Sequence, residues 1–374
     1  MKIGAFKTSL KEHENRVPIY PEHLRWLSSE VKKVLFLEKG YGESFGFGDE
    51  ELQADCAGFL NRGEIFKECD ILILPKPTEA DLTKMRSGQI LWGWVHCVQQ
   101  FNIAQCAIDR KITVLAWEAM HHWMNGIKLL HVFYKNNEIA GYASVIQTLE
   151  LLGLDGHYGP RKKVLIFSYG SVSRGAIYAL QGRGFNNIHV LTRRETHLVA
   201  DQNPDVYYYY LYKDGEGFSC RPPVGDSFSL EEFMADSDII VNGILQNPND
   251  PYIFIKNDHL NKLRKNAVII DISCDKGMGF EFARPTTFSE PIITLKNYIK
   301  YYSVDHAPSY LWNAASREIS KALIPYLVIL CKNNFDIHSD MTLSKAIEIE
   351  NGIIKNRDIL LFQKREKEYP HKQL

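Results

Sequence analysis

The stretch SYGSVSRGA (Ser168–Ala176) decides the fold, because it joins the apolar run KKVLIF to a segment with helical spacing. A glycine turn between a strand and a helix is the phosphate-binding fingerprint of a dinucleotide-binding βαβ unit. Gly170 would let the backbone approach a pyrophosphate, whose charge the free amide groups of the helix start, near Val172, would meet. The motif is degenerate, since Ser168 and Ser173 stand where the full motif has its outer glycines. The predicted contacts to the cofactor at this turn are Ser168, Gly170, Ser171, Val172 and Ser173.

The end of the next expected strand, NIHVLT (187–192), bears on the phosphate state of the cofactor. An acidic residue there would accept hydrogen bonds from a ribose 2′-hydroxyl and would repel a 2′-phosphate. This chain has Thr192, Arg193 and Arg194 instead. A hydroxyl and two guanidinium groups suit a phosphorylated ribose by charge and by bidentate geometry, which favours NADP(H). The alternative interpretation is a solvated basic loop at a strand end.

Two series of short apolar runs flank a long segment with an apolar stripe, Glu138–Gly153, which we interpret as a connecting helix. The first series is KIGAF (2–6), KVLFLE (33–38), DILIL (70–74), QILWGWV (89–95) and ITVLAW (112–117). The second series is KVLIF (163–167), NIHVLT (187–192), DIIVNGIL (238–245), AVIIDIS (267–273) and IITL (292–295). Strands that alternate with helical segments predict parallel sheets. The run Tyr207–Tyr210 is expected to be a strand and its edge rather than a binding cassette.

The chain has 374 residues, which is more than one hydrophobic core usually serves, because single cores stop growing at roughly 250 to 300 residues. Helical spacing over Pro308–Asn334 predicts a helix that returns from the second domain to the first. We therefore expect an α/β protein with two Rossmann-like domains, parallel sheets and a cleft between them. The catalytic domain would be discontinuous, over residues 1–137 and 305–374, around a dinucleotide-binding domain at 138–304.

The composition is that of an ordinary globular protein, with 45% hydrophobic residues, 24% charged residues and a net charge of −1. It lacks the excess of lysine and arginine that nucleic-acid binding needs. The start MKIGAFKTSL has no signal-peptide pattern, and no run of about 18 apolar residues occurs, so we expect a cytoplasmic protein without a membrane span. Seven cysteines are scattered singly, which predicts neither a disulfide framework nor a metal site.

Four polar residues of the first domain stand near the ends of expected strands, where open parallel sheets place their ligands. They are Arg16, Lys76, His96 and Glu118. Lys76 lies between two prolines that stiffen it, and a lysine at a cleft can polarise a carbonyl or exchange a proton. His96 ends the strand LWGWVH, and imidazole is the usual proton donor or acceptor when a carbonyl or imine is reduced. An isolated histidine is also often a satisfied buried side chain.

Three residues of the later sequence are further candidates. Asp275 in IDISCDKG follows an expected strand end, and VDHAPS (304–309) brings Asp305 and His306 to the start of the returning helix. Asp305 or Ser309 could equally cap that helix. Structural capping and catalysis explain the VDHAPS residues about equally well.

These motifs, taken together and in order, resemble the alanine dehydrogenase and transhydrogenase-like dehydrogenases over nearly the whole chain. The wider group includes lysine-forming saccharopine dehydrogenases and N5-(carboxyethyl)ornithine synthases. The motifs that carry the resemblance are ENRVPIYPEH (14–23), the lysine of LPKP, WGWVHC (92–97), GSVSRGA (170–176), IDISCDKGMGFEFARPTTFSEP (270–291) and VDHAPS. WGWVHCVQ, VDHAPS and the tail KAIEIENGIIKNRDILLFQKRE (345–366) look closest to the carboxyethylornithine synthase branch.

The resemblance implies an opine-type reductive condensation, in which a 2-oxo acid, typically pyruvate, condenses with the side-chain amine of an amino acid such as ornithine or lysine. NADPH then reduces the imine to a secondary amine. By carry-over, Arg16 holds the oxo-acid carboxylate, Lys76 and His96 form the acid/base pair, and Asp275 lies beside the nicotinamide and ribose. Glu118, Asp305 and His306 complete the candidate substrate contacts.

Three matters stay open at this point. The amine pocket is not placed, and its candidate wall residues, which are as a rule more often core, are Trp92, Trp94, Trp117, His121, His122 and Trp123. The partners are small molecules, and the sequence leaves a homo-oligomer open. The rival functions are a simple amino-acid dehydrogenase that uses ammonia, and a cofactor-binding sensor without turnover.

Overall fold

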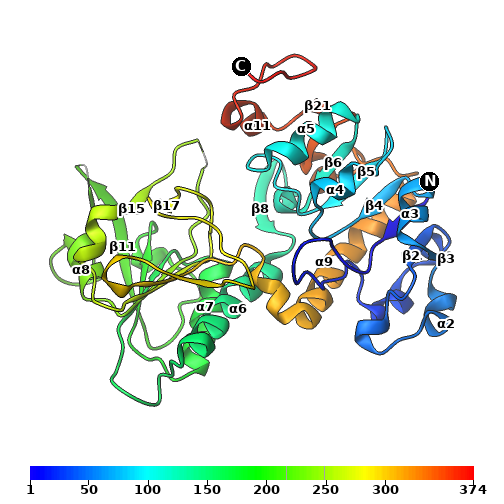
Figure 1. Ribbon diagram of the computed structural model, residues 1–374. Coiled ribbons are helices and arrows are strands. Elements are labelled where there is room, and N and C mark those ends of the chain that lie inside the picture. The colour runs from blue at the N-terminus through cyan, green and yellow to red at the C-terminus, as the bar shows by residue number, and fades with distance from the viewer. Residues whose placement is uncertain (216, 248) are drawn as a thin grey trace. The chain divides into compact units, whose positions relative to one another are not determined.

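The computed structural model describes residues 1–215, 217–247 and 249–374, which form two compact units. The first unit combines Met1–Lys135 with Trp312–Leu374, and the second is the continuous segment Asn136–Leu311. Figure 1 shows this discontinuity, because the orange and red C-terminal elements lie with the blue and cyan N-terminal ones. Within the described part of the chain, no helix is long and apolar enough to cross a membrane.

An eight-stranded sheet forms the centre of the first unit, in the order β21-β20-β6-β5-β4-β1-β2-β3. Strands β1 to β6 run parallel, in the spatial order 3-2-1-4-5-6. In this doubly wound arrangement, ligands bind beyond the carboxyl ends of the strands. The strands are β1 (Ile3–Ala5), β2 (Leu35–Glu38), β3 (Gly58–Leu60), β4 (Ile71–Ile73), β5 (Ile90–Gly93), β6 (Thr113–Ala116), β20 (Ile347–Glu350) and β21 (Ile353–Ile354), and a separate hairpin comprises β7 (His121–Met124) and β8 (Ile127–His131).

The helices of the first unit come from both of its chain segments. They are α1 (Ser29–Lys32), α2 (Asp49–Leu52), α3 (Arg62–Glu68), α4 (Glu79–Leu82), α5 (Phe101–Asp109), α9 (Trp312–Lys332), α10 (Met341–Lys345) and α11 (Arg357–Phe362). Helix α9 is fixed to the N-terminal segment by two side-chain bonds. Ser316 Oγ accepts from the backbone N–H of Val17 at 3.0 Å, and Ser320 Oγ lies 3.0 Å from Nδ1 of His23. Specific side-chain contacts therefore hold α9, the first helix after the chain returns to this unit, against the N-terminal segment.

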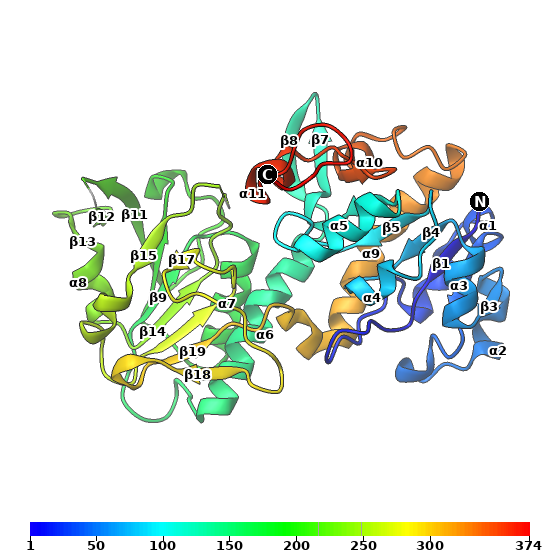
Figure 2. The same ribbon diagram turned by 45° about the horizontal axis from the view of Figure 1, so that its top comes forward.

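The second unit contains a nine-stranded sheet in the order β13-β12-β11-β10-β9-β14-β16-β19-β18. Its six parallel strands again have the spatial order 3-2-1-4-5-6, from β11 across β9 to β19 (Figure 2). The strands of this unit are β9 (Val164–Phe167), β10 (Ile188–Thr192), β11 (Val206–Asp214), β12 (Gly217–Arg221), β13 (Phe228–Ser229), β14 (Ile239–Asn242), β16 (Val268–Asp271), β18 (Ile292–Thr294) and β19 (Lys300–Tyr302), with a short pair β15 (Ile253–Ile255) and β17 (Gly279–Phe280) beside them.

Alternate residues of these strands face two separate cores. Val164 and Ile166 of β9 pack with apolar residues of α6 (Tyr134–Leu152) and α7 (Ser171–Gly182). Leu165 and Phe167 face the other side, toward α8 (Leu230–Ala235). Because both faces are covered, the strands read as continuous apolar runs rather than as alternating ones.

The predicted fold class is confirmed, and all ten predicted strands are present. The strand over IITL is β18, which pairs antiparallel at an edge, whereas the sixth parallel strand is the unpredicted KYY segment Lys300–Tyr302. The Tyr207–Tyr210 run lies within β11, and the connecting helix is α6. The returning helix α9 begins at Trp312, after a 3-10 turn over Ala307–Leu311.

Candidate active site

Three predicted residues of the first unit follow three neighbouring parallel strands at the same edge of the sheet. Lys76 follows β4, His96 follows β5 and Glu118 follows β6. The Lys76 ammonium group is near enough to Glu118 to lower the pKa of that carboxyl. Ser9, in the segment after β1, donates its hydroxyl to the carbonyl oxygen of Lys76. The structure therefore places an ammonium group, an imidazole and a carboxyl after three neighbouring strands, at one edge of the sheet.

The backbone of His96 is held by Glu118. His96 adopts a φ of 51°, in the left-handed region that only a few per cent of residues other than glycine occupy. Its backbone N–H donates a 2.5 Å hydrogen bond to Oε1 of Glu118, and its ring Nδ1 lies 4.0 Å from the same oxygen. Gln363 supports the next turn of chain, since its amide donates to the carbonyl oxygens of Cys97 and Val98 at 2.7 and 3.1 Å.

Arg16 is buried and already has a carboxylate partner. Its Nε donates to Oε1 of Glu14 at 2.8 Å and its Nη2 donates to Oε2 at 2.5 Å, so Glu14 occupies one edge of the guanidinium group. The guanidinium also stacks on the Trp94 ring, 4.9 Å from its centroid. Glu14 was not predicted as a site residue, because an acid two residues from an arginine carries no sequence signal that distinguishes it from a surface pair.

The glycine turn in the second unit has the geometry of a phosphate-binding turn. Ser168, in the place of the first glycine, takes a φ of 78°. Gly170 is the N-cap of α7, and beyond its own chain neighbours a Cβ built on it would come within 4 Å of one described atom, Oγ of Ser168 at 3.8 Å. Ser173 is buried, and its hydroxyl donates to the carbonyl oxygen of Phe167 at 3.1 Å, so its side chain closes the turn internally.

Two glycines bring α6 and α7 into backbone contact behind this turn. A Cβ on Gly175 would lie 1.8 Å from the carbonyl oxygen of Glu138, and a Cβ on Gly141 would lie 1.8 Å from that of Val172. Neither distance is compatible with a side chain. Gly175, the second glycine of GSVSRGA, thus allows a close helix–helix contact. In the full motif, the third glycine allows a close contact between the helix and a strand.

The end of β10 is basic and connected to the glycine turn. Arg194 and Arg193 are exposed, whereas Thr192 is buried. Nη2 of Arg194 donates to the carbonyl oxygen of Tyr169 at 2.9 Å, and the Arg193 guanidinium stacks 4.9 Å from the centroid of the Tyr252 ring. Glu195, the nearest acid in sequence, forms an ion pair of 2.5 Å with Arg221.

The remaining predicted residues follow β16 and β19, which lie on the opposite side of β9 from β10 in the sheet. Asp275 is half-buried and follows β16, and Asp305 follows β19. Nδ1 of the buried His306 lies 2.5 Å from Oδ1 of Asp305, which orients the imidazole. The hydroxyl of Ser309 is buried and makes no hydrogen bond among the described residues, so it does not cap the returning helix.

A buried carboxyl that sequence reasoning missed ends β16. Asp271 accepts hydrogen bonds from Asn242 Nδ2 at 2.9 Å and from the Tyr301 hydroxyl at 2.8 Å. Burial raises the pKa of Asp271 to about 7, against these hydrogen bonds, which lower it. In the sequence, the run AVIIDIS around Asp271 predicted only a strand. The two hydrogen-bond partners of Asp271 lie in other strands, so the sequence did not mark it as a site residue.

Sequence profiles of two domains match the chain. Residues 7–140 match "Alanine dehydrogenase/PNT, N-terminal domain" and residues 195–357 match "Alanine dehydrogenase/PNT, C-terminal domain". The chain belongs to the alanine dehydrogenase/PNT family. This confirms the predicted resemblance.

Individual members of the family align along nearly the full length. An N(5)-(carboxyethyl)ornithine synthase of Clostridium botulinum is 29% identical over 374 residues, which cover 95% of this chain and 100% of the relative. An alanine dehydrogenase of Mycolicibacterium smegmatis is 25% identical over 360 residues, covering 94% of each chain.

Two solved structures share the fold. An L-alanine dehydrogenase superposes with a TM-score of 0.75 at 20% identity, covering 97% of this chain and 99% of the other. A transhydrogenase from Sinorhizobium meliloti gives a TM-score of 0.67 at 15% identity, covering 95% and 99%. At these identities the likeness concerns the fold.

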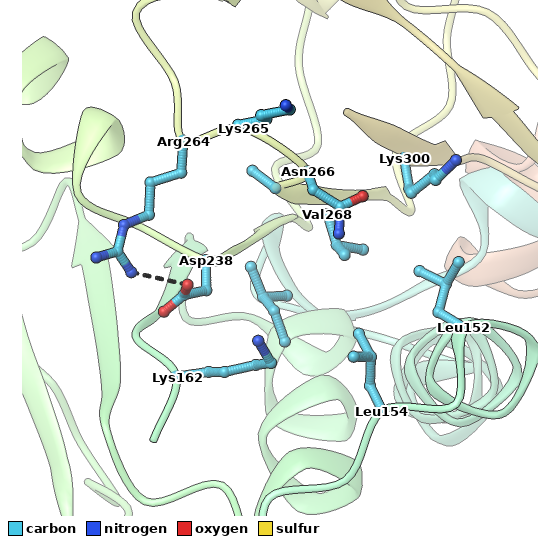
Figure 3. Close-up of a pocket in the computed structure, with 11 residues that line it drawn as sticks. Leu152, Leu154, Lys162, Asp238, Arg264, Lys265, Asn266, Val268 and Lys300 are labelled. Atoms are coloured by element: carbon cyan, nitrogen blue, oxygen red, sulfur yellow. Dashed lines mark hydrogen bonds and ion pairs between the residues drawn. The ribbon is translucent and has the colours of Figure 1, made fainter. Parts of the chain in front are cut away.

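A pocket in the second unit lies away from the residues described above. It has a volume of about 280 Å³ and is drawn in Figure 3. Asp238 and Ala267, in its wall, immediately precede β14 and β16, so the pocket opens at the amino ends of the strands. Arg264 donates to Asp238 across it at 2.8 Å. The glycine turn is at the opposite, carboxyl edge of the sheet, and this pocket is not the candidate active site.

Two of the residues considered for an amine pocket belong to the core. Trp92 and Trp117 are fully buried, and Trp117 packs edge-on against Trp94 with ring centroids 4.7 Å apart. His122 bonds to the Tyr326 hydroxyl at 3.1 Å. Trp92 and Trp117 are therefore core residues and do not form the wall of an amine pocket.

Proposed function

We propose that this chain is an NADP(H)-dependent reductase that joins a 2-oxo acid, with pyruvate as the first candidate, to the side-chain amine of an amino acid such as ornithine or lysine. The product would be an N-(carboxyalkyl) amino acid. The observation that carries the proposal is the placement of Lys76 and His96 at the carboxyl ends of two adjacent strands. The name of the Clostridium botulinum relative, which aligns over 95% of this chain, supports the same reaction class.

The second unit suits a dinucleotide at the glycine turn. The space in front of Gly170 is open, α7 has twelve residues and therefore a developed positive end, and Ser173 and Gly175 hold the turn against its neighbours. The amides of Ser171, Val172 and Ser173 would meet the pyrophosphate, with Ser168 forming the turn. Asp275 would lie beside the nicotinamide ribose. When bound, NADPH supplies the hydride for reduction of an imine.

The preference for the phosphorylated cofactor rests on the end of β10. Arg194 places its guanidinium group at the glycine turn, whereas that of Arg193 lies over the Tyr252 ring, and the hydroxyl of Thr192 accepts from the backbone N–H of Arg194 at 3.2 Å. The one acidic neighbour in sequence is neutralised by Arg221. A ribose 2′-phosphate would gain charge-assisted hydrogen bonds here, and a bare 2′-hydroxyl would lack a carboxylate partner.

The first unit would perform the proton transfers. Attack of the amine on the oxo-acid carbonyl gives a carbinolamine, which loses water to form the imine. One of Lys76 and His96 would accept the proton that the amine releases, and the other would donate a proton to the departing hydroxyl. The pair works only if the two environments keep Lys76 and His96 in different protonation states. Asp305 and His306 are further proposed substrate contacts.

Arg16 would bind the oxo-acid carboxylate. Glu14 accepts hydrogen bonds along the Nε–Nη2 edge of this guanidinium group. Glu14 and Trp94 would hold the guanidinium group rigid before substrate arrives, which reduces the entropy lost on binding. Glu118 would act chiefly by fixing His96.

A simple amino-acid dehydrogenase that uses ammonia is the second candidate, since alanine dehydrogenases also match the full chain at 25% and 23% identity. The deciding assay follows NADPH absorbance with pyruvate and ornithine or lysine, with each substrate alone, and with pyruvate and ammonia. We expect oxidation that depends on both organic substrates, with the secondary amine identified by mass spectrometry. Equal rates with ammonia would establish the second candidate, and tight NADPH binding without turnover would favour a sensor.

A further inference from the structure

The C-terminal segment of the chain packs against the turn that carries His96. This turn, residues 96–100, lies between β5 and α5. The backbone N–H groups of Gln99 and Gln100 close it, since they donate to the carbonyl oxygen of His96 at 3.1 and 2.9 Å. Gln363, the C-cap of α11, contacts the turn from the C-terminal segment. Figures 1 and 2 show α11, in red, beside α5.

The side-chain amide of Gln363 makes this contact. Its Nε2 donates to the carbonyl oxygen of Cys97 at 2.7 Å and to that of Val98 at 3.1 Å. Gln363 is 6% exposed, and Cys97 is fully buried. One amide group therefore satisfies two carbonyl oxygens that take part in neither a helix nor a strand. Because the contact is buried, loss of the donor would leave these oxygens without water to replace it.

Arg365 fixes which way the Gln363 amide faces. Its Nε donates to Oε1 of Gln363 at 2.7 Å, so the amide oxygen points to the guanidinium group and the NH2 group points to the turn. Arg365 also holds α5, the helix that follows the turn. Its Nη1 donates to Oε1 of Gln105 at 2.7 Å, and its guanidinium group lies 4.5 Å from the centroid of the Phe101 ring.

Arg365 is a buried cation whose hydrogen-bond acceptors are neutral. It is 4% exposed, and it donates to the side chains of Gln363 and Gln105 and to the carbonyl oxygen of His371. Asp109 is near enough to act on its charge but bonds to Gln105 instead. Nη2 of Arg365 has no hydrogen-bond partner among the described residues. A buried charge without a paired acid is a poor source of stability, which points to a role in orienting its neighbours.

We propose that Gln363, oriented by Arg365, is a positioning residue for catalysis, so that the C-terminal segment sets where the His96 imidazole stands. The inference rests on the proposed function for the catalytic role of His96. The left-handed backbone of His96 is held on its N–H side by Glu118. Gln363 holds the residues directly after it, so the backbone is fixed on both sides of the Cα that bears the ring. A displacement of about 1 Å can lower a rate by 10²-fold.

The decisive variant is Gln363→Glu, which keeps the shape of the side chain and its contact with Arg365. It replaces the donor by a carboxylate oxygen that faces the two carbonyl oxygens of the turn. The turn should open, and hydrogen–deuterium exchange of the Gln99 and Gln100 amides should become about tenfold faster. Mass spectrometry of peptides that cover the turn measures this in the full chain without substrates. Gln373→Glu is the matched control and should leave the exchange unchanged, because Gln373 is exposed and only its backbone pairs with Arg365.

Turnover tests the catalytic half of the proposal. With pyruvate and ornithine or lysine, Gln363→Glu should lower kcat by about 10- to 100-fold. NADPH affinity should stay at the wild-type value, because the glycine turn belongs to the second unit. The KM for the 2-oxo acid should change less than kcat, since Arg16 is held by Glu14. A merely structural role would lower the melting temperature and leave kcat unchanged at temperatures where the variant is folded.

Arg365→Lys tests the orientation of the amide and serves where Gln363→Glu does not fold. A lysine keeps the charge but lacks the planar fork that bonds several oxygens at once, so exchange and kcat should move in the same directions by smaller amounts. The double variant should be no slower than Gln363→Glu alone, because Arg365 acts through Gln363.

Unchanged exchange at the turn in either folded variant would overturn the proposal, and so would faster exchange together with a wild-type kcat. The exchange measurement needs no turnover. Faster exchange in Gln363→Glu, combined with a wild-type chain that reduces no pair of substrates, would keep Gln363 as the residue that holds the turn and would reject the proposed function.

Discussion

Nη2 of Arg194 donates a 2.9 Å hydrogen bond to the carbonyl oxygen of Tyr169, so the basic end of β10 is fastened to the glycine turn after β9. One of the two arginines is thus part of the turn's architecture. The other, Arg193, stacks on Tyr252 and is exposed. Arg193 is therefore the better probe of cofactor choice, because its replacement leaves the hydrogen bond between Arg194 and the turn in place.

Replacing Arg193 with alanine should weaken NADPH binding and leave NADH binding unchanged. Loss of one charge-assisted contact to a 2′-phosphate corresponds to about a tenfold rise in Kd, or 1.4 kcal/mol. Calorimetric titration with both cofactors measures the difference. Arg183→Ala is the control, since Arg183 follows α7 at its far end and pairs with Glu150. An equal loss of affinity for NADPH and NADH would refute a role for Arg193 at the 2′-phosphate.

Replacing Lys76 or His96 with alanine should reduce turnover by about 10² to 10⁴-fold, the range for loss of a general acid or base. NADPH affinity should stay at the wild-type value, because both residues belong to the first unit and the glycine turn belongs to the second. Steady-state rates combined with cofactor titration separate the two quantities. Lys84→Ala, just after α4, is the control and should remain active. Wild-type rates in both alanine variants would remove the catalytic assignment.

Replacing Gly175 with alanine should destabilise the second unit strongly. The new methyl group would overlap the carbonyl oxygen of Glu138 at 1.8 Å, so α6 and α7 would have to separate. Overpacking of this kind typically costs about 1 to 3 kcal/mol, and a backbone obstacle puts it at the upper end. Thermal unfolding of the purified chain measures the loss. Gly182→Ala, in the same helix with no atom within 4 Å of the new methyl, should be neutral or slightly stabilising.

Replacing Asp271 with asparagine should change how stability depends on pH. The folded-state pKa of Asp271 is raised from 3.8 to about 7, so the unfolded chain releases this proton first. The contribution of Asp271 to stability is therefore complete at low pH and declines as the pH rises from about 4 to about 7. Denaturant titrations should show the wild type losing stability relative to Asp271→Asn across that window and no further change above it. A constant difference would contradict the raised pKa.

The elements that the sequence predicted are those whose local pattern agrees with their final environment. The runs at Val164–Phe167 and Ile71–Ile73 are buried on both faces, so continuous apolar residues mark them. Strand β19 escaped prediction because Lys300–Tyr302 reads as a polar aromatic segment. Its apolar environment is supplied by β16 and β18 on either side, which no window along the chain contains.

The site divides in the same way. Residues at strand ends, such as Lys76 and His96, could be found because the topology fixes where carboxyl ends lie. The residues that act on them could not. Glu14 gains its role from its contact with Arg16. Gln363, which supports the turn after His96, comes from a segment more than half the chain away. Propensity and spacing do not report such long-range pairs.

The antiparallel pairing of β20 with β6 has a consequence for the order in which the protein can fold. The second unit is continuous and complete once Leu311 has left the ribosome, whereas the first sheet waits for the segment near Glu348. Until then β6 presents an open edge, which can pair with another chain. Translation thus finishes the nucleotide-binding half early and leaves the half that carries Lys76 and His96 to be closed last.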